Sequence, residues 1–355
     1  MISRRAFIGP AILLVAIVVG YPAYWLYAAA LGETLIVDWI DQQRRQGRVV
    51  NHGPIEKSGF PLLVRLEILA PESVNLADGF SWRSERLRID LRPWDLQRLR
   101  LEATGAQQLQ LKSTADALDM TVNATGAEGV VLLARAGGLT ALSLILRDVR
   151  ATDAEQGQIL RTDRILADFA QPDRPPIAHT ETALEMSLAA EDIELARIDA
   201  PLLGKTIGSL RVKAEVLGPL QGETIARTLS QWRDSGGTLE VRWLNLVWGA
   251  LDLRANGTVA LDERMRPLGA LTADIRGYEE TLEALAEAEI LRRDILPASR
   301  VTLNLLARTD PNDGRRVLTV PLTAQDGALF LGPIKLSEIP EVTMSLRSRP
   351  SARQD

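Results

Sequence analysis

Few residues of this chain have the types and spacing that catalysis requires. It has no cysteine and only two histidines, His52 and His179, each beside a turn-like segment. Either imidazole could act as a general base, but no nucleophile motif accompanies it, so a solvated turn histidine is the simpler interpretation. The serines Ser187, Ser209 and Ser230 lack the Gly-x-Ser-x-Gly pattern of a nucleophile elbow. We therefore predict no catalytic residue.

Metal and cofactor chemistry has equally little support. Residues 310–314 (Asp-Pro-Asn-Asp-Gly) resemble the start of a calcium loop, but the spacing is one residue short and Val320 stands where a glutamate is needed. A polar hairpin turn is the preferred interpretation. The lack of cysteine excludes thiolate nucleophiles, iron–sulfur ligation and cysteine zinc sites. We expect no metal ligand and no cofactor.

The charge balance also excludes a class of partner. The formal net charge is −5 and the isoelectric point is about 5.4, which is not the basic footprint of a nucleic-acid-binding protein. The most basic stretch runs from Arg83 to Arg100, but Glu85, Asp90 and Asp95 lie within it. We interpret it as a solvated strand face rather than a patch for anionic lipid.

The first thirty-two residues contain a long uncharged segment. Arg4 and Arg5 precede it, and residues 6–32, a length of 27 residues, carry no charged side chain. A helix of about 20 apolar residues crosses a bilayer, and its positive end stays in the cytoplasm. We predict a cytoplasmic N-terminus at residues 1–5 and a transmembrane helix at residues 6–32. Besides the two arginines, the aromatic side chains expected as membrane-interface anchors are Tyr21, Tyr24, Trp25 and Tyr27.

Two other interpretations of this segment stay open. Residues 28–30 are three alanines, a small-residue pattern at which a signal peptide could be cleaved. The apolar run before them is longer than a signal peptide needs. Residues 3–7 resemble a twin-arginine export signal. The uncleaved anchor is preferred, which predicts a single-pass protein of the bacterial inner membrane with its C-terminal domain in the periplasm. Nucleic acid is then not a partner.

Beyond residue 48 the apolar residues recur with a period of two, which is typical of half-buried strands. The clearest case is Leu62, Val64, Leu66 and Ile68. Similar patterns predict strands within residues 86–92, 108–112, 118–123, 210–216, 239–243, 251–253, 259–261, 271–275, 301–305 and 318–329. Shorter apolar runs at residues 129–133 and 142–146 flank a Gly-Gly turn. The pair Asn256-Gly257 predicts a hairpin turn between two of these strands.

Helical periodicity is rarer. It predicts a juxtamembrane helix at residues 33–47, a helix at residues 222–233 and a third at residues 278–293 that ends before Pro297. The segment Pro172–Pro176 (PDRPP) is a crossover loop or a sub-boundary at residues 171–177. We expect one β-rich periplasmic domain at residues 48–344 and a polar tail at residues 345–355.

The fold class follows from this count: mainly β (α+β), with an N-terminal transmembrane helix and then a large antiparallel twisted sheet with two or three packing helices. So few helices cannot cover the apolar face of so large a sheet, which must fold on itself as a sandwich or barrel, or form a curled trough. Trp243, Leu246 and Trp248 make a wide apolar segment. It is either core packing or the lining of an apolar groove.

Four segments carry a resemblance to a known family. They are residues 59–61 (Gly-Phe-Pro), 248–253 (Trp-Gly-Ala-Leu-Asp-Leu), 257–262 (Gly-Thr-Val-Ala-Leu-Asp) and 321–333, which begins Pro-Leu-Thr-Ala-Gln-Asp-Gly. The chain resembles an uncharacterised bacterial family, domain of unknown function twenty-one twenty-five, which implies no active site. The alternating pattern of glycine, leucine and alanine is more loosely similar to the AsmA-like envelope proteins, whose β-rich troughs are thought to handle lipids.

The sequence leaves three functional hypotheses. The first is a non-enzymatic, membrane-anchored periplasmic protein that binds lipid or another apolar envelope molecule. The second is an assembly or scaffold protein that binds another envelope protein. The third is an exported hydrolase, which would need two carboxylates about 5–10 Å apart in a cleft.

Overall fold

The helices are few and lie at three places along the chain. A computed structural model describes residues 19–112, 119–135, 138–155, 157–196, 203–287, 296–309 and 314–342. Four helices lie in this part of the chain, namely α2 (Tyr21–Arg45), α3 (Ile225–Asp234), α4 (Tyr278–Glu287) and α5 (Leu296–Leu306). The prediction of a mainly β protein with a few helices is confirmed.

Most of the described chain is β-structure. The eighteen strands are β1 (Val49–Asn51), β2 (Ile55–Ser58), β3 (Val64–Leu69), β4 (Glu72–Asn75), β5 (Phe80–Arg92), β6 (Asp95–Lys112), β7 (Asp119–Leu133), β8 (Leu139–Asp153), β9 (Gly157–Ala170), β10 (Thr182–Leu195), β11 (Thr206–Leu217), β12 (Thr238–Trp248), β13 (Leu251–Leu261), β14 (Pro267–Arg276), β15 (Ala307–Thr309), β16 (Arg316–Gln325), β17 (Ala328–Leu331) and β18 (Ile334–Glu338).

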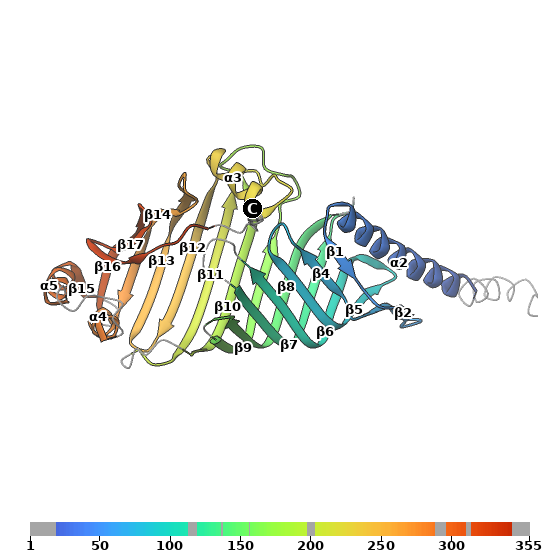
Figure 1. Cartoon of the computed structure of the whole chain (residues 1–355), viewed down its shortest axis with the longest axis horizontal. Helices are drawn as coiled ribbons and strands as arrows, with labels where there is room; N and C mark the ends of the chain where they lie inside the picture. The colour runs from blue at the N-terminus through green and yellow to red at the C-terminus, as the bar shows by residue number, and fades with distance from the viewer. Residues whose placement is uncertain are drawn as a thin grey trace, which may run out of the picture.

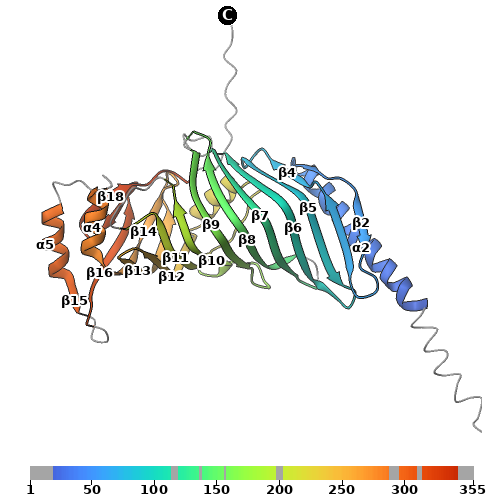
Figure 2. The same ribbon diagram turned by 90° about the horizontal axis from the view of Figure 1, so that it is seen from below.

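The strands form one antiparallel sheet of simple topology. From β5 to β14 each strand pairs with the next along the chain, and β14 then pairs with β16. Short strands finish both edges: β3 and β4 pair side by side with β5, and β15 and β17 pair with β16. The result is a long twisted sheet, with α2 at one end and α4 and α5 at the other (Figure 1, Figure 2).

Helix α2 covers the first end of the sheet. Trp25, Ala28 and Ala29 are buried against Val64 and Leu66 of β3 in one apolar cluster. Part of the uncharged stretch at residues 25–32 is therefore buried against protein, and a hydropathy pattern cannot distinguish this from burial in lipid, whereas Leu26 and Tyr27 on the same stretch are exposed. Within the described residues no helix is long and apolar enough to cross a membrane. Residues 6–18 of the predicted span lie outside that part, and the predicted juxtamembrane helix is the second half of α2.

Helices α4 and α5 cover the other end. Their buried side chains, including Leu282 and Leu303, pack on Leu318 and Val320 of β16 in the largest apolar cluster of the described chain. The prediction of a strand at residues 301–305 is wrong, because this segment belongs to α5. Pro297 stands in the first turn of α5, where its missing N–H costs no hydrogen bond, so it begins a helix rather than following one.

Two other predictions are corrected by the strand register. Asn256-Gly257 is not a turn but the middle of β13, which pairs on both sides. A Cβ on Gly257 would lie 2.3 Å from the carbonyl oxygen of Ala270, so this glycine allows two strands to approach closely. The loop that contains Pro172–Pro176 connects β9 and β10, which pair with each other, so the sheet continues across it. The predicted tail at residues 345–355 lies outside the described residues.

Candidate functional site

The register between strands places nearly all rows of apolar cross-strand neighbours on one face of the sheet. Cross-strand partners can be followed through seven successive strands, β6 to β12, and each partner is apolar: Leu99, Val131, Leu142, Phe169, Met186, Ala214 and Val241. Side chains alternate between the two faces along a strand, so the register between strands decides which side chains share a face across the whole sheet. The sheet therefore has a continuous apolar face that runs from α2 to α4.

The middle of this apolar face is incompletely covered. Helix α2 packs on β1 and β3, whereas α4 packs on β13 and α5 on β16. In the central strands the fully buried residues are mostly alanines, such as Ala103, Ala190 and Ala214, while larger neighbours stay partly accessible. Leu188 at the centre of β10 is 38% exposed. A large apolar surface of this kind in a protein marks an interaction site.

The opposite face of the sheet is held by ion pairs between neighbouring strands. They include Arg88–Glu102, Arg147–Glu128, Arg211–Glu191 and Arg242–Glu215. Two hydrogen bonds from the Arg242 guanidinium, at 2.7 and 2.9 Å, hold the pKa of Glu215 below its usual value. Of the arginines predicted to form a solvated strand face, Arg83, Arg86 and Arg88 belong here, and each pairs with a glutamate.

One part of the apolar face is covered by a helix and forms a partly open cavity of about 660 Å³. Its floor is one row of cross-strand neighbours from four strands: Leu184, Val216, Leu239 and Val259. Cavities of roughly 300–1,000 Å³ with mainly apolar walls are typical of small-ligand sites. The geometry suits an apolar chain lying on the sheet beneath a cover.

Helix α3 is that cover. Ile225, Leu229 and Trp232 line the cavity from above. These positions are spaced at intervals of four and three, so one face of α3 is apolar, as the sequence predicted. The Trp232 indole N–H donates to the Leu217 carbonyl at 2.7 Å. A Cβ on Gly237 would lie 2.2 Å from the same indole nitrogen, so the glycine gives the ring its space.

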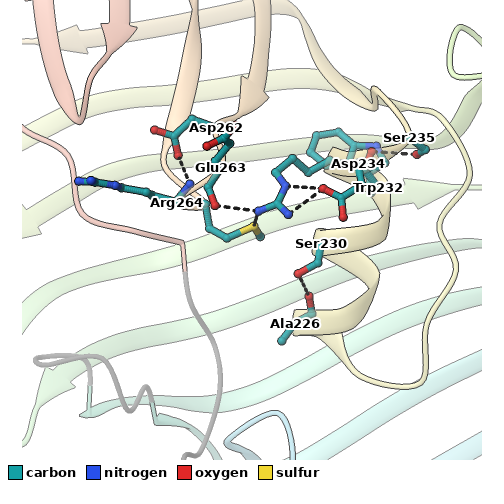
Figure 3. A network of polar contacts seen from close by, with 10 residues as sticks. Ala226, Ser230, Trp232, Asp234, Ser235, Asp262, Glu263 and Arg264 are labelled. Atoms are coloured by element: carbon teal, nitrogen blue, oxygen red, sulfur yellow. Dashed lines mark hydrogen bonds and ion pairs between the residues drawn. The ribbon is translucent and has the colours of Figure 1, made fainter.

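Two contacts hold α3 in place at its ends. Near the C-terminal end, the Arg233 guanidinium pairs with Asp234 and donates to the Glu263 carbonyl at 3.1 Å in the turn between β13 and β14 (Figure 3). At the N-terminal end, the Ile225 N–H donates to the Asp78 carboxylate at 2.7 Å. Asp78 is 3% exposed and belongs to the turn between β4 and β5.

The Asp78 contact also reports the curvature of the sheet. Strands β6 to β10 lie between β5 and β11, yet the turn before β5 reaches the helix that follows β11. A flat sheet would hold these elements far apart, since neighbouring strands are spaced by about 4.8 Å. The sheet must therefore curve around its apolar face, as a trough does. Sequence reasoning missed Asp78, because nothing in its local pattern identifies a partner 147 residues away.

The predicted groove residues do not share one surface. Leu246 and Trp248 lie on the apolar face, where Leu246 pairs with Leu210, and the Trp248 indole N–H donates to the Gly204 carbonyl at 2.9 Å. Trp243 pairs with Lys213 on the opposite face, because the register of β12 shifts between Val241 and Leu244. The bulge breaks the alternation from which the groove was predicted. None of the three is among the residues that line the α3 cavity.

The predicted membrane-interface residues fall into three groups. Tyr24 and Tyr27 are exposed, and Tyr21 is partly exposed, at the beginning of α2. Trp25 is only 7% exposed and donates from its indole N–H to the Leu63 carbonyl at 2.8 Å, so it is a core residue of the domain. Arg4 and Arg5 lie outside the described residues.

The residues considered for chemistry stay apart. The His52 ring contacts its neighbour's carbonyl, that of Gly53, at 2.7 Å, and His179 lies in the exposed loop before β10. The Ser187 hydroxyl donates to Asp168 at 3.1 Å. In the described ranges no cluster of three or more potential metal ligands occurs. Residues 310–313, most of the calcium-like loop, lie outside those ranges.

A second, polar cavity of about 350 Å³ lies at the end of the sheet near β15. It is lined by two aspartates, Asp252 and Asp274, which the hydrolase hypothesis could use. Asp252 pairs with Arg254 and Arg276, and the Thr319 hydroxyl donates to Asp274 at 2.6 Å. The Asp252–Arg276 and Thr319–Asp274 contacts join neighbouring strands, as the ion pairs of the polar face do elsewhere. The two aspartates therefore have a structural explanation.

Fold and site together define a class of protein: a single curved antiparallel sheet with one apolar face, covered locally by a helix, and without a recognised catalytic centre in the described chain. Within that class the family is clear. Residues 25–340 match the bacterial family described as uncharacterized protein conserved in bacteria (DUF2125), and the chain belongs to it. No curated protein and no solved structure matches the chain. The looser likeness to the AsmA-like envelope proteins is thus not shown.

Proposed function

We propose that this protein is a non-enzymatic carrier of lipid, or of another apolar envelope molecule, held at the bacterial inner membrane with its sheet domain in the periplasm. The observation that carries the proposal is the continuous apolar face, which α3 covers over strands β10 to β13 to form a cavity. An apolar chain that lies on this face would lose part of its contact with water.

The exposure of the apolar face to water is unfavourable. Each Å² of apolar surface in water costs about 25 cal/mol, and the central strands leave leucine, valine and methionine side chains partly accessible. A ligand of acyl-chain chemistry would remove this surface from water without needing specific polar contacts. Membrane attachment is supported by residues 6–18, which are uncharged and precede α2 in the sequence.

Lipid analysis of the purified full-length chain tests the proposal. We expect solvent extraction and mass spectrometry to find lipid bound in a fixed ratio to protein. Leu188→Glu places a carboxylate in the middle of the apolar face and should lower that ratio several-fold, since a buried charge without a partner is costly.

The matched control lies one residue further along β10. Ala189 points to the opposite face, where its cross-strand partner is Arg211, so Ala189→Glu should leave the ratio unchanged. A wild-type chain without lipid, or an equal loss in both variants, would contradict the proposal. One envelope protein recovered in equal amount, with no lipid, would instead favour the scaffold role.

A further inference from the structure

Exposed apolar side chains gather where α2 begins. They lie on two neighbouring connections, the loop between β2 and β3 and the turn between β5 and β6. Phe60 and Leu62 come from the loop, and Trp94 and Leu96 from the turn and the start of β6. Leu62 is 69% exposed and Trp94 is 62% exposed. These four residues, which we term the apolar tips, are separate from the α3 cavity and have no part in it.

Helix α2 fixes the backbone of both tips. The Tyr21 hydroxyl donates to the Pro61 carbonyl, and the Tyr24 hydroxyl donates to the Pro93 carbonyl at 2.6 Å. The Phe60 ring also packs edge-on against Trp25, with ring centroids 5.6 Å apart. Both tips are therefore attached to the first turns of α2, while Leu62 and Trp94 remain directed to the outside.

The charges around the tips suit the headgroup region of a bilayer. Arg92 and Arg98 flank the β5–β6 turn, and both are exposed. Asp95 lies between them, and Asp90, two residues before Arg92, is paired with Arg65. No ion pair of Arg92 or Arg98 is found in the described chain. A tryptophan between arginines is typical of the headgroup region of a bilayer, where the ring lies at the boundary and the cations meet lipid phosphates.

The position of the N-terminal end of α2 also favours a bilayer as the surface that the tips contact. The N-terminal end of α2 lies at the β2 and β5 end of the sheet, away from α4 and α5 (Figure 1, Figure 2). The residues that precede α2 are apolar from Ala6 onwards, with Arg4 and Arg5 before them. A segment of that composition embedded in a bilayer would bring the apolar tips to the same bilayer.

We propose that the apolar tips form a membrane-docking surface, in which Leu62 and Trp94 enter the headgroup boundary beside α2. Docking fixes the orientation of the sheet and keeps the α2 end of the apolar face beside the lipid. This inference rests on the membrane attachment in the proposed function, but it does not depend on a ligand in the cavity.

Site-specific labelling tests the inference. Because the chain has no cysteine, Leu62→Cys and Trp94→Cys each create a single attachment point for an environment-sensitive fluorophore. The matched control is Leu305→Cys, a leucine 82% exposed on α5 at the other end of the sheet. The full-length chain is reconstituted in vesicles of phosphatidylethanolamine and phosphatidylglycerol, and attachment is checked by flotation.

We expect the labels at positions 62 and 94 to shift to shorter wavelength and to be quenched at least twofold more by brominated lipid than the label at position 305. If the chain floats with vesicles but all three labels behave alike, the docking surface is refuted while membrane attachment stands. If the chain does not float, the attachment in the proposed function fails as well.

Discussion

The contact between Asp78 and helix α3 gives the sharpest prediction about the α3 cavity. Asp78→Ala removes the acceptor of the Ile225 N–H, which lies at 2.7 Å. It also removes the partner of the Asn75 side-chain amide, which donates to the second carboxylate oxygen at 2.6 Å. The first turn of a helix has no internal acceptors for its N–H groups, so the Ile225 N–H would lose its partner.

The magnitude follows from the kind of hydrogen bond. A hydrogen bond to a charged group contributes about 1.5–3 kcal/mol. The Thr224 hydroxyl still accepts from the Arg227 N–H at 3.3 Å, so α3 keeps part of its cap. A loss of about 2 kcal/mol in the local closure of α3 corresponds to a roughly thirtyfold increase in its opening.

Amide hydrogen exchange measured by mass spectrometry can resolve this local effect. We expect peptides from α3 to exchange roughly thirtyfold faster in Asp78→Ala, by the same conversion of free energy, while peptides from β16 stay unchanged. Asp163→Ala is the control, because the Asp163 side chain is 84% exposed and its nearest arginine nitrogen is 3.9 Å away. Unchanged exchange of α3 in Asp78→Ala, or an equal effect in the control, would refute the assignment of Asp78 as the residue that holds the cover.

Three further predictions concern the sheet itself. Leu318→Ala, at a fully buried position between β14 and β15, should lower the free energy of unfolding by about 2–5 kcal/mol in urea titrations. Gly257→Ala should cost about 1–3 kcal/mol through its clash with β14, whereas Gly208→Ala, with ordinary contacts from 3.6 Å, should cost much less in the same titrations. Because Arg242 lowers the folded-state pKa of Glu215, their contact stabilises the protein above the unfolded pKa near 4.5 and is lost as the pH falls below it. Glu215→Gln should therefore flatten the decrease in stability between neutral pH and about pH 3, and an unchanged slope would contradict this.

The sequence allowed the class of fold to be predicted, because alternation is a local property. Strands such as β3 and β11 show apolar residues at every second position, so their existence and their buried face could be inferred. Because the same alternation recurs in ten or more strands, the predicted helices were too few to cover the apolar face of the sheet. The α3 segment was also predicted, since Ile225, Leu229 and Trp232 recur at helical spacing.

What could not be predicted depends on partners distant in sequence. An uncharged helix face is equally compatible with lipid and with the side chains of β3, and only the tertiary contacts show that Trp25, Ala28 and Ala29 pack on β3. Leu303 in α5 is buried whereas Val301 and Leu305 are exposed, so a short apolar run was assigned the wrong period. Asp78 shares the same limitation, because its role depends on a helix encoded far along the chain.

The most direct test of the apolar face compares the two faces of the sheet at neighbouring positions of one strand. On β8, Leu144 lies on the apolar face and Ser143 on the opposite one, as their partners Ala167 and Asp168 on β9 indicate. A photoreactive residue is placed at either position of the full-length chain in intact cells, and adducts are identified by mass spectrometry. The account predicts lipid adducts at position 144 and none at position 143. Equal labelling at both positions, or protein adducts alone at position 144, would contradict it.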